Sequence, residues 1–263
     1  MENQSKSTLP QEANTPTPTS SSAKPETPAD TEGRQPGISV IRILAIIAMI
    51  SSVVLFALPF INAGLIKKYS QINLNSISAE TMAKNLERPG PEVKDEIEEI
   101  GVFNIWPWLN NYDEDNIIGQ LTIPDLHVNL AIFKDTTNAN LLAGTCQLKQ
   151  QQTMGEGNYT LSGHRAKGKG VLLHNLMEAD IGARINLTDK KNIYVYRIVD
   201  TVQTKTDAVD MLEDQQTSKF HDRPIISIMT CYFGKSSSRW FVIGELVTVL
   251  PYSVAEQTNG KLP

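Results

Sequence analysis

The sequence predicts a mainly β protein: one closed barrel of about eight short strands with a few short helices, preceded by one transmembrane helix. Three observations support this prediction. Alternating apolar and polar runs, separated by Gly, Asn and Asp turn residues, recur over residues 105–253. Helical patterns in that part are few and short. One long apolar segment without charges comes before it, at residues 43–66.

Composition narrows the class of protein further. The chain has 263 residues and a net charge of −5, so no basic surplus points to nucleic acid. It has 2 cysteines, too few for a disulfide scaffold. They could form one bridge, Cys146–Cys231, if the domain lies outside the cytoplasm, and that bridge would consume both thiols.

The N-terminal part divides into a tail and an anchor. Residues 1–37 are dominated by Ser, Thr, Pro, Gln and Glu, which predicts a disordered tail. The apolar segment lies between Arg42 and Lys67 and would form a helix of roughly 36 Å, enough to cross a hydrocarbon core of about 30 Å. We therefore expect a transmembrane anchor at residues 38–66. A signal peptide is the alternative, but its apolar core is roughly 7–15 residues long. The flanking positive charges are nearly balanced and leave the orientation open.

A polar connector follows at residues 67–104. It has two short helical patterns, separated at Pro89-Gly90-Pro91. An acidic run at residues 92–99 is interpreted as a solvated helix face and not as a metal site.

The barrel is expected at residues 105–253, followed by a C-terminal tail at 254–263. A hairpin with a Pro-Asp turn is predicted within 116–133. Five further strand-like runs lie at 157–164, 183–189, 192–204, 224–231 and 239–249. Helical patterns occur at 136–144 and 171–179.

Three residues at the ends of predicted strands are candidates for catalysis. Cys231 ends one predicted strand and Arg239 begins the next, so they would face each other across a loop. His164 ends another strand beside a glycine, where we expect it to be exposed enough to meet a substrate. Of the other histidines, His127 is interpreted as a surface residue, His174 as a packing residue and His221 as part of a polar loop.

These three residue types form a complete set for acyl transfer. A cysteine nucleophile needs a base or cation that favours its thiolate, and a histidine supplies one. The negative charge that develops on the carbonyl oxygen needs fixed donors, and an arginine stays charged at physiological pH. The chemistry alone also leaves open a noncatalytic binding barrel in which Cys231 only packs.

The motifs around these residues resemble those of the sortases, the membrane-anchored cysteine transpeptidases of Gram-positive bacteria. The family's Thr-Leu-x-Thr-Cys signature appears as Ser-Ile-Met-Thr-Cys at residues 227–231, followed by Arg239. Its Gly-His signature appears as Ser162-Gly163-His164. The segment "TIPDLHVNLAIFKDTTNANLLAG" resembles the family's Ile-Pro-containing opening strands and the helix that follows them. The segments "QTMGEGNYTLSGHR" and "INLTDKKNIYVYRI" resemble class A, the housekeeping branch. The likeness covers about residues 117–249 and implies a sortase-type eight-stranded β-barrel.

Two departures from the family pattern are visible. Ser227 and Ile228 replace the signature's Thr and Leu, which bears on packing beside the nucleophile. Cys146 is unusual for the family and lies far from the signature in sequence. Because a bridge to Cys231 would abolish the implied activity, we expect Cys146 to be a free, partly buried thiol.

The resemblance also implies a reaction. The substrate would be a secreted protein with a Leu-Pro-x-Thr-Gly sorting signal, and Cys231 would attack the Thr carbonyl and release the Gly-bearing fragment. His164 would act as acid and then base, Arg239 would orient the peptide and stabilise the oxyanion, and an amine of lipid II or peptidoglycan would resolve the thioester. Ser162, Met229 and Thr230 would line the peptide groove, although Met229 is equally plausible as core.

Topology and cofactors follow from the same resemblance. The tail is expected in the cytoplasm and the barrel outside the cell, on a single-pass anchor. Some class A members bind calcium, but we interpret the acidic residues of the loop after Thr204 as a solvated helix face and expect no metal and no cofactor; they are Asp207, Asp210, Glu213 and Asp214. Two alternatives share the chemistry: a hydrolytic cysteine peptidase, and a pilin-polymerising sortase with a Lys acceptor.

Overall fold

The computed structural model describes residues 39–89, 97–101, 103–149, 151–166, 168–232 and 238–253. The predicted tails at 1–37 and 254–263 lie outside the described residues, as does most of the acidic run at 92–99. The chain consists of two compact units, with the boundary between Ile47 and Ala48. The second unit holds the rest of the N-terminal helix, the connector and the barrel.

The N-terminal helix α1 spans Val40–Ser70. It is the one helix in the described part of the chain that is long and apolar enough to cross a membrane. Its large apolar side chains are exposed as far as Ile61, but Asn62, Ile66 and Ser70 are buried. Residues four apart share one face of a helix, and Ile66 belongs to the barrel core. The last turns of α1 therefore pack on the barrel domain, so the exposed apolar surface ends earlier than the predicted boundary at residue 66.

The connector contains two short helical elements. A 3₁₀ turn, η1, spans Leu74–Ser76, and helix α2 spans Ala79–Leu86, where Ser78 caps the helix by accepting a hydrogen bond from Thr81 N. Most of the second predicted helical pattern lies outside the described residues, and its described end, residues 97–100, is not helical.

Two lysines fasten this connector to the barrel. Lys190, in the turn before strand β6, donates through Nζ to the carbonyls of Leu74 and Ile77. The buried Lys134 donates in the same way to the carbonyls of Leu86 and Arg88, just at and beyond the end of α2. Both ammonium groups thus bind carbonyls at the ends of helical turns, where the carbonyl of Leu74 also accepts from Ile77 N at 3.2 Å.

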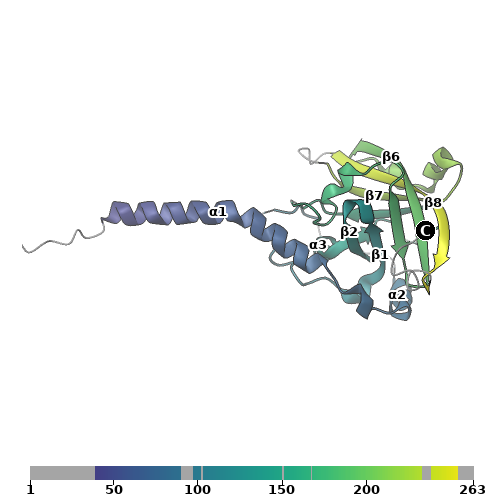
Figure 1. Cartoon of the computed structure of the whole chain (residues 1–263), viewed down its shortest axis with the longest axis horizontal. Coiled ribbons are helices and arrows are strands. Elements are labelled where there is room, and N and C mark those ends of the chain that lie inside the picture. The colour runs from purple at the N-terminus through teal and green to yellow at the C-terminus, as the bar shows by residue number, and fades with distance from the viewer. Residues whose placement is uncertain are drawn as a thin grey trace, which may run out of the picture. The chain divides into compact units, whose positions relative to one another are not determined.

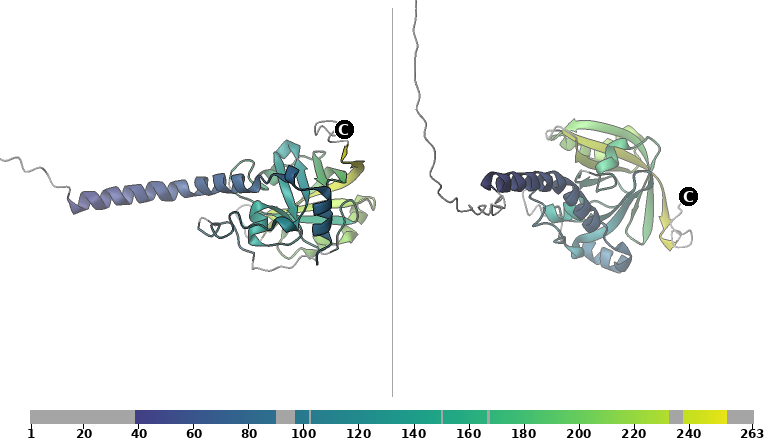
Figure 2. Two further views of the ribbon diagram at one scale, coloured as in Figure 1. Left: turned by 90° about the horizontal axis from the view of Figure 1, so that it is seen from below. Right: turned by 60° about the vertical axis from the view of Figure 1, so that its left-hand side comes forward.

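Eight strands close into the predicted barrel, in the order β1-β2-β3-β4-β7-β8-β6-β5 (Figure 1). Figure 2 shows the long strands β6 and β8 side by side along one wall. The bounds are β1 Ile117–Ile123, β2 Val128–Phe133, β3 Gly144–Gln147, β4 Asn158–Gly163, β5 Arg184–Thr188, β6 Asn192–Lys205, β7 Ile225–Cys231 and β8 Ser238–Pro251.

The predicted hairpin is confirmed as β1 and β2, joined by the 3₁₀ turn η3 at Pro124–Leu126. Strand β3 is the one that the sequence pattern missed. It has four residues, all buried, so it has no polar alternation, and it follows helix α3 (Asn138–Ala143) directly. The second helical pattern, at 171–179, forms a 3₁₀ helix, η4, over His174–Glu178. The remaining 3₁₀ turns are η2 Glu114–Asn116, η5 Val209–Leu212 and η6 Asp214–Phe220.

Both faces of the sheet around β7 are covered. Ile226 and Ile228 point into the barrel core, where they join Leu161 and Val242. Ile225 and Met229 lie on the outer face, in a second apolar cluster beneath η5 and η6. The alternation along β7 therefore assigns Cys231, two residues after Met229, to the outer face.

The acidic loop between β6 and β7 is exposed, but as 3₁₀ turns and not as the predicted helix face. Asp214 also ties this loop to β4, because its Oδ1 accepts hydrogen bonds from Asn158 N at 2.9 Å and Lys149 Nζ at 2.7 Å. These two donors lower the pKa of Asp214.

We predict that Lys190→Met loosens the connector, because two carbonyls at η1 lose their donor. The cost should be about 1–3 kcal/mol for this part of the chain. Faster amide hydrogen exchange at residues 74–86 would measure it. Lys191→Met is the matched control, since Lys191 is exposed and only its backbone N–H donates, to Asp189. Equal exchange in both variants would contradict the fastening role.

Candidate active site

The pairing of β4 with β7 brings two distant parts of the chain into register. The strands are parallel, and their residue pairs run from Asn158 with Ile225 to Ser162 with Met229. The contact continues one step further, because Thr230 Oγ1 donates to the carbonyl of Gly163 at 2.9 Å. The next residues in the same register are His164 and Cys231. Since neighbouring strands lie about 4.8 Å apart, the two backbones are adjacent at this level.

The pairing of β7 with β8 adds a residue of a third strand beside His164 and Cys231. Cys231 pairs directly with Arg239 in the antiparallel ladder, and Thr204 of β6 pairs with Arg239 on its other side. Directly paired residues share a face of a sheet. By this register His164, just after the end of β4, lies beside Cys231 of β7, which pairs with Arg239 of β8. We call these three residues, which the sequence predicts to be catalytic, the catalytic row.

His164 is buried, which corrects the expectation of an exposed histidine. Its exposed fraction is 7%, because the chain after it folds back: Leu173 N donates to the carbonyl of His164 at 3.2 Å, and Arg165 and Leu172 form a bridge. Burial disfavours the imidazolium and lowers the pKa of His164 to about 4. Within the described residues, its Nε2 is buried and has no hydrogen-bond partner.

Cys231 is a free, half-buried thiol. Burial raises the pKa of the thiol, and the neighbouring Arg239 guanidinium opposes this by lowering it. The carboxylate of Glu99 raises the pKa of the same thiol. Together with the lowered pKa of His164, these effects favour a neutral thiol and a neutral imidazole at pH 7.

Glu99 is the residue near the site that sequence reasoning missed. It belongs to the connector, and its carbonyl accepts from Asn104 Nδ2 at 2.9 Å. Asn104 Oδ1 also accepts from Gly101 N at 2.8 Å, which closes a compact loop. In the sequence Glu99 was one member of an acidic run, and no pattern indicated that this member lies close enough to act on Cys231.

The three residues expected to line the groove differ in exposure. Met229 is partly exposed on the outer face, beside Cys231. Ser162 pairs with Met229 and is buried, and its Oγ has no partner within the described part of the chain. Thr230 is 1% exposed and its hydroxyl is already bonded to Gly163, so it fixes the spacing between β4 and β7 from behind the row.

The other singled-out residues lie away from the row or are inert. His127 and His221 are exposed, and His174 is half-buried with Nδ1 2.7 Å from the carbonyl of Ala166. Cys146 is free, as expected, but fully buried instead of partly buried, and burial raises the pKa of its thiol. It pairs with Ser162, so it is one strand from β4 and not remote from the site. Within the described residues no group of three or more His, Cys, Asp or Glu side chains could hold a metal.

Comparison with known proteins adds a family to this geometry. A sortase domain model matches residues 121–247. The chain is 30% identical over 205 residues to sortase A of Listeria monocytogenes, covering 77% of this chain and 90% of the relative. It is 34% identical over 136 residues to sortase A of Bacillus anthracis, covering 51% and 62%.

A solved sortase structure shares the fold. The structure of sortase C-3 from Streptococcus pneumoniae is 19% identical, covers 74% of this chain and 96% of its own chain, and superposes with a TM-score of 0.52. The structure of Listeria monocytogenes sortase A is 28% identical, covers 56% of this chain and 99% of its own, and has a TM-score of 0.48.

The two charges that act on Cys231 should be separable by mutation. We predict that Arg239→Gln raises the pKa of the thiol and that Glu99→Gln lowers it, because each change removes one electrostatic influence. The pH dependence of iodoacetamide alkylation at Cys231 measures both shifts. Glu87→Gln, an exposed carboxylate of the connector, is the control. A shift of the same sign in both test variants would contradict this electrostatic account.

The burial of His164 predicts a pH-dependent stability. As the pH falls below 6.5, the ordinary pKa of histidine, residue 164 binds a proton in the unfolded chain. In the folded chain it binds this proton only near its lowered pKa of about 4. Stability is therefore full above pH 6.5 and falls as the pH drops from 6.5 to 4. Between pH 7.5 and 5 the loss should be about 2 kcal/mol.

Urea unfolding of the wild type and of His164→Gln at both pH values measures this contribution. The wild type should lose about 2 kcal/mol more than the variant. An equal loss in the two proteins would mean that residue 164 titrates with an ordinary pKa.

Proposed function

Because the chain belongs to the sortase family, we propose that it is a class A, housekeeping sortase that joins secreted proteins to a cell-wall precursor. The observations that carry this proposal are the direct pairing of Cys231 with Arg239 and the parallel register of β4 with β7, which continues toward His164 and Cys231. The substrate is a Leu-Pro-x-Thr-Gly sorting signal, cleaved between Thr and Gly. The acceptor is an amine of lipid II or peptidoglycan.

The first half of the reaction forms a thioester. The Cys231 proton passes to His164, and the thiolate forms a bond to the carbonyl carbon of the Thr. The carbonyl becomes an oxyanion, and the Arg239 guanidinium, which stays charged at every physiological pH, supplies fixed donors for it. When the oxyanion collapses, the carbon–nitrogen bond breaks, and the His164 imidazolium gives its proton to the departing Gly amine.

The second half reverses these roles. The acceptor amine attacks the thioester carbonyl and loses its proton to neutral His164, and Cys231 leaves as a thiolate that recovers this proton. The low pKa of His164 keeps the imidazole neutral at pH 7, so it is in the form that can accept this proton, but it also makes the imidazole a weaker base. A half-buried row also limits the access of water, which competes with the amine for the thioester.

The outer face beside the row offers a surface for the peptide. Phe241 pairs with Met229 on one side and with Val202 on the other, and these three belong to the apolar cluster beneath η5 and η6. The Leu side chain of the signal packs against Met229 and Val202, which are partly exposed, since Phe241 between them is buried. Ser162 and Thr230 act in this proposal by holding β4 and β7 at their spacing.

Anchoring follows from α1. With the tail in the cytoplasm, the exposed apolar part of α1 crosses the membrane once, and the barrel lies outside the cell. Secreted proteins that emerge through the same membrane then meet the catalytic row on the side where cell-wall precursors are displayed. In this arrangement the chain acts as a single-pass membrane enzyme.

The test uses a fluorescent Leu-Pro-x-Thr-Gly peptide, with and without triglycine. The wild type should cleave the peptide, and triglycine should divert the product from the free acid to the triglycine adduct. Cys231→Ala should lose cleavage completely, and His164→Ala and Arg239→Ala should lose at least about a hundredfold in kcat/KM. Cys146→Ala is the control, because Cys146 is buried and outside the row. Cleavage by Cys231→Ala would overturn the proposal, and a product that stays the free acid would favour a hydrolase.

A further inference from the structure

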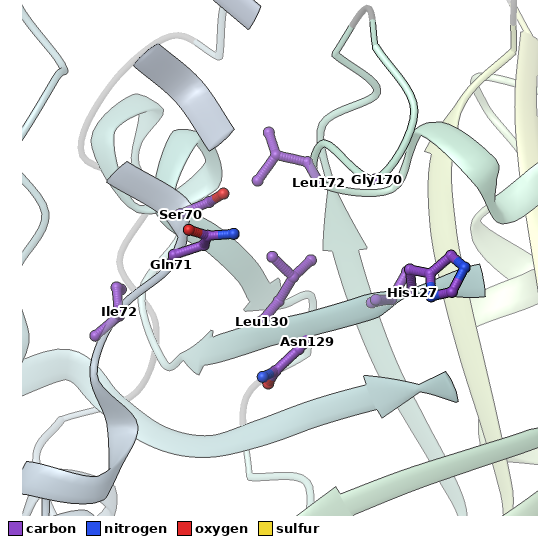
Figure 3. A pocket seen from close by; sticks show the side chains of 9 residues that line it. Ser70, Gln71, Ile72, His127, Asn129, Leu130, Gly170 and Leu172 are labelled. Carbon is purple, nitrogen blue, oxygen red and sulfur yellow. The ribbon is translucent and has the colours of Figure 1, made fainter. Parts of the chain in front are cut away.

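A pocket of about 310 Å³ lies beside the end of α1. Three segments line it: residues 70–72 at the end of the helix, residues 127–130 at the start of β2, and Gly170 and Leu172 in the loop after β4. Figure 3 shows Gln71 on one side, His127 on the other, Leu172 above and Leu130 below. Its volume is at the lower end of the range for small-molecule sites.

The pocket lies close to the proposed membrane surface. The exposed apolar part of α1 ends at Ile61, and Ser70 follows nine residues later, or about 14 Å along a helix. Lys67 and Lys68 lie between these points, exposed, in the last turn of α1. The two ammonium groups are thus at the level of the lipid phosphates. The pocket is at the level of a headgroup attached to those phosphates.

The pocket also lies at the same end of the barrel as the catalytic row. Ala131 of β2 pairs with Gly144 of β3, and the adjacent Thr145 pairs with Gly163 of β4. Ala131 is therefore at the level of His164, two strands away. Leu130, one residue before Ala131 on β2, is about 15 Å from Cys231, which is three strands away. The loop that carries Gly170 and Leu172 is hydrogen-bonded to the carbonyl of His164 through Leu173 N.

The side chains around the pocket indicate a ligand with many hydrogen-bonding groups. Gln71 is exposed and its amide both donates and accepts, and the His127 imidazole is also exposed. Leu130 and Leu172 supply an apolar floor and roof. Gly170 has φ of +72°, and a Cβ there would meet open space, so the rim is unobstructed. Lys169 is exposed beside it. Amide and imidazole groups with lysines at one edge fit a sugar joined to phosphate.

We propose that this anchor-side pocket binds the sugar of a lipid-linked, phosphate-bearing acceptor, with Lys67 and Lys68 on its phosphates. The inference rests on the proposed function, since it assigns a place to lipid II, the amine acceptor. The geometry matches the required reach. An amine carried on a peptide of about five extended residues spans roughly 16 Å from the sugar, which is the separation between Leu130 and Cys231.

The experiment uses the full chain in phosphatidylcholine vesicles with lipid II as acceptor and a sorting peptide as donor. Gln71→Trp fills the pocket, and Lys191→Trp, at an exposed turn between β5 and β6, is its control. Lys67→Gln with Lys68→Gln removes the phosphate contacts, and Lys191→Gln with Lys219→Gln removes the same charge elsewhere. Triglycine replaces lipid II in a parallel series.

We expect Gln71→Trp and the Lys67/Lys68 variant to raise KM for lipid II about tenfold, with KM for triglycine and the rate of peptide hydrolysis unchanged. The two control variants should behave as the wild type. An unchanged KM for lipid II would overturn the proposal. A parallel loss with triglycine would also overturn it, because the pocket variants would then act through the catalytic row.

Added phosphatidylglycerol separates the two sources of phosphate. If phosphatidylglycerol abolishes the difference in KM for lipid II between the wild type and Gln71→Trp, the pocket binds phosphate alone and the sugar assignment is wrong. Failure of the proposed function has a different signature: no cleavage that depends on Cys231 in any arm, with or without lipid II.

Discussion

The parallel pairing of β4 with β7 is the constraint on which the site depends. Two strands far apart in sequence are held side by side, and the hydroxyl of Thr230, bonded to the carbonyl of Gly163, fixes the last step of the ladder. A slip of this register by one residue would turn either His164 or Cys231 to the opposite face. A closed barrel resists such a slip, because every strand is paired on both sides.

Burial then sets the electrostatics of the row. The fold that buries His164 lowers the pKa of its imidazole, and the same burial raises the pKa of the Cys231 thiol. Both changes favour the uncharged pair, so the fixed positive charge of Arg239 is the main force that stabilises a thiolate. Glu99 works against it from the connector, which gives a segment outside the barrel an influence on the nucleophile.

The sequence predicts the parts of this fold that local patterns determine. The hairpin of β1 and β2 follows from alternation and a Pro-Asp turn, and the pairing of Cys231 with Arg239 follows from the short loop between two apolar runs. His164 was found through a motif, and only the barrel brings it beside Cys231. Short or long-range features were missed: β3 lacks alternation because all of it is buried, and the burial of His164 depends on a loop that folds back from Leu173. The sequence of the last turns of α1 is apolar enough to predict a membrane helix. Only the packing of Ile66 in the barrel core shows that these turns belong to the barrel domain.

A disulfide test measures the register of the row most directly. Backbones of adjacent strands are about 4.8 Å apart, within the Cα separations of about 4.4–6.8 Å that a disulfide spans. Oxidation of a His164→Cys variant should therefore give an intramolecular bond to Cys231, identified by peptide mass mapping, with the buried Cys146 remaining free. Ser162→Cys, one row lower on β4, is the comparison and should react more slowly. If the folded His164→Cys protein forms no bond to Cys231, residues 164 and 231 are not neighbours on one face, and the account of the catalytic row is wrong.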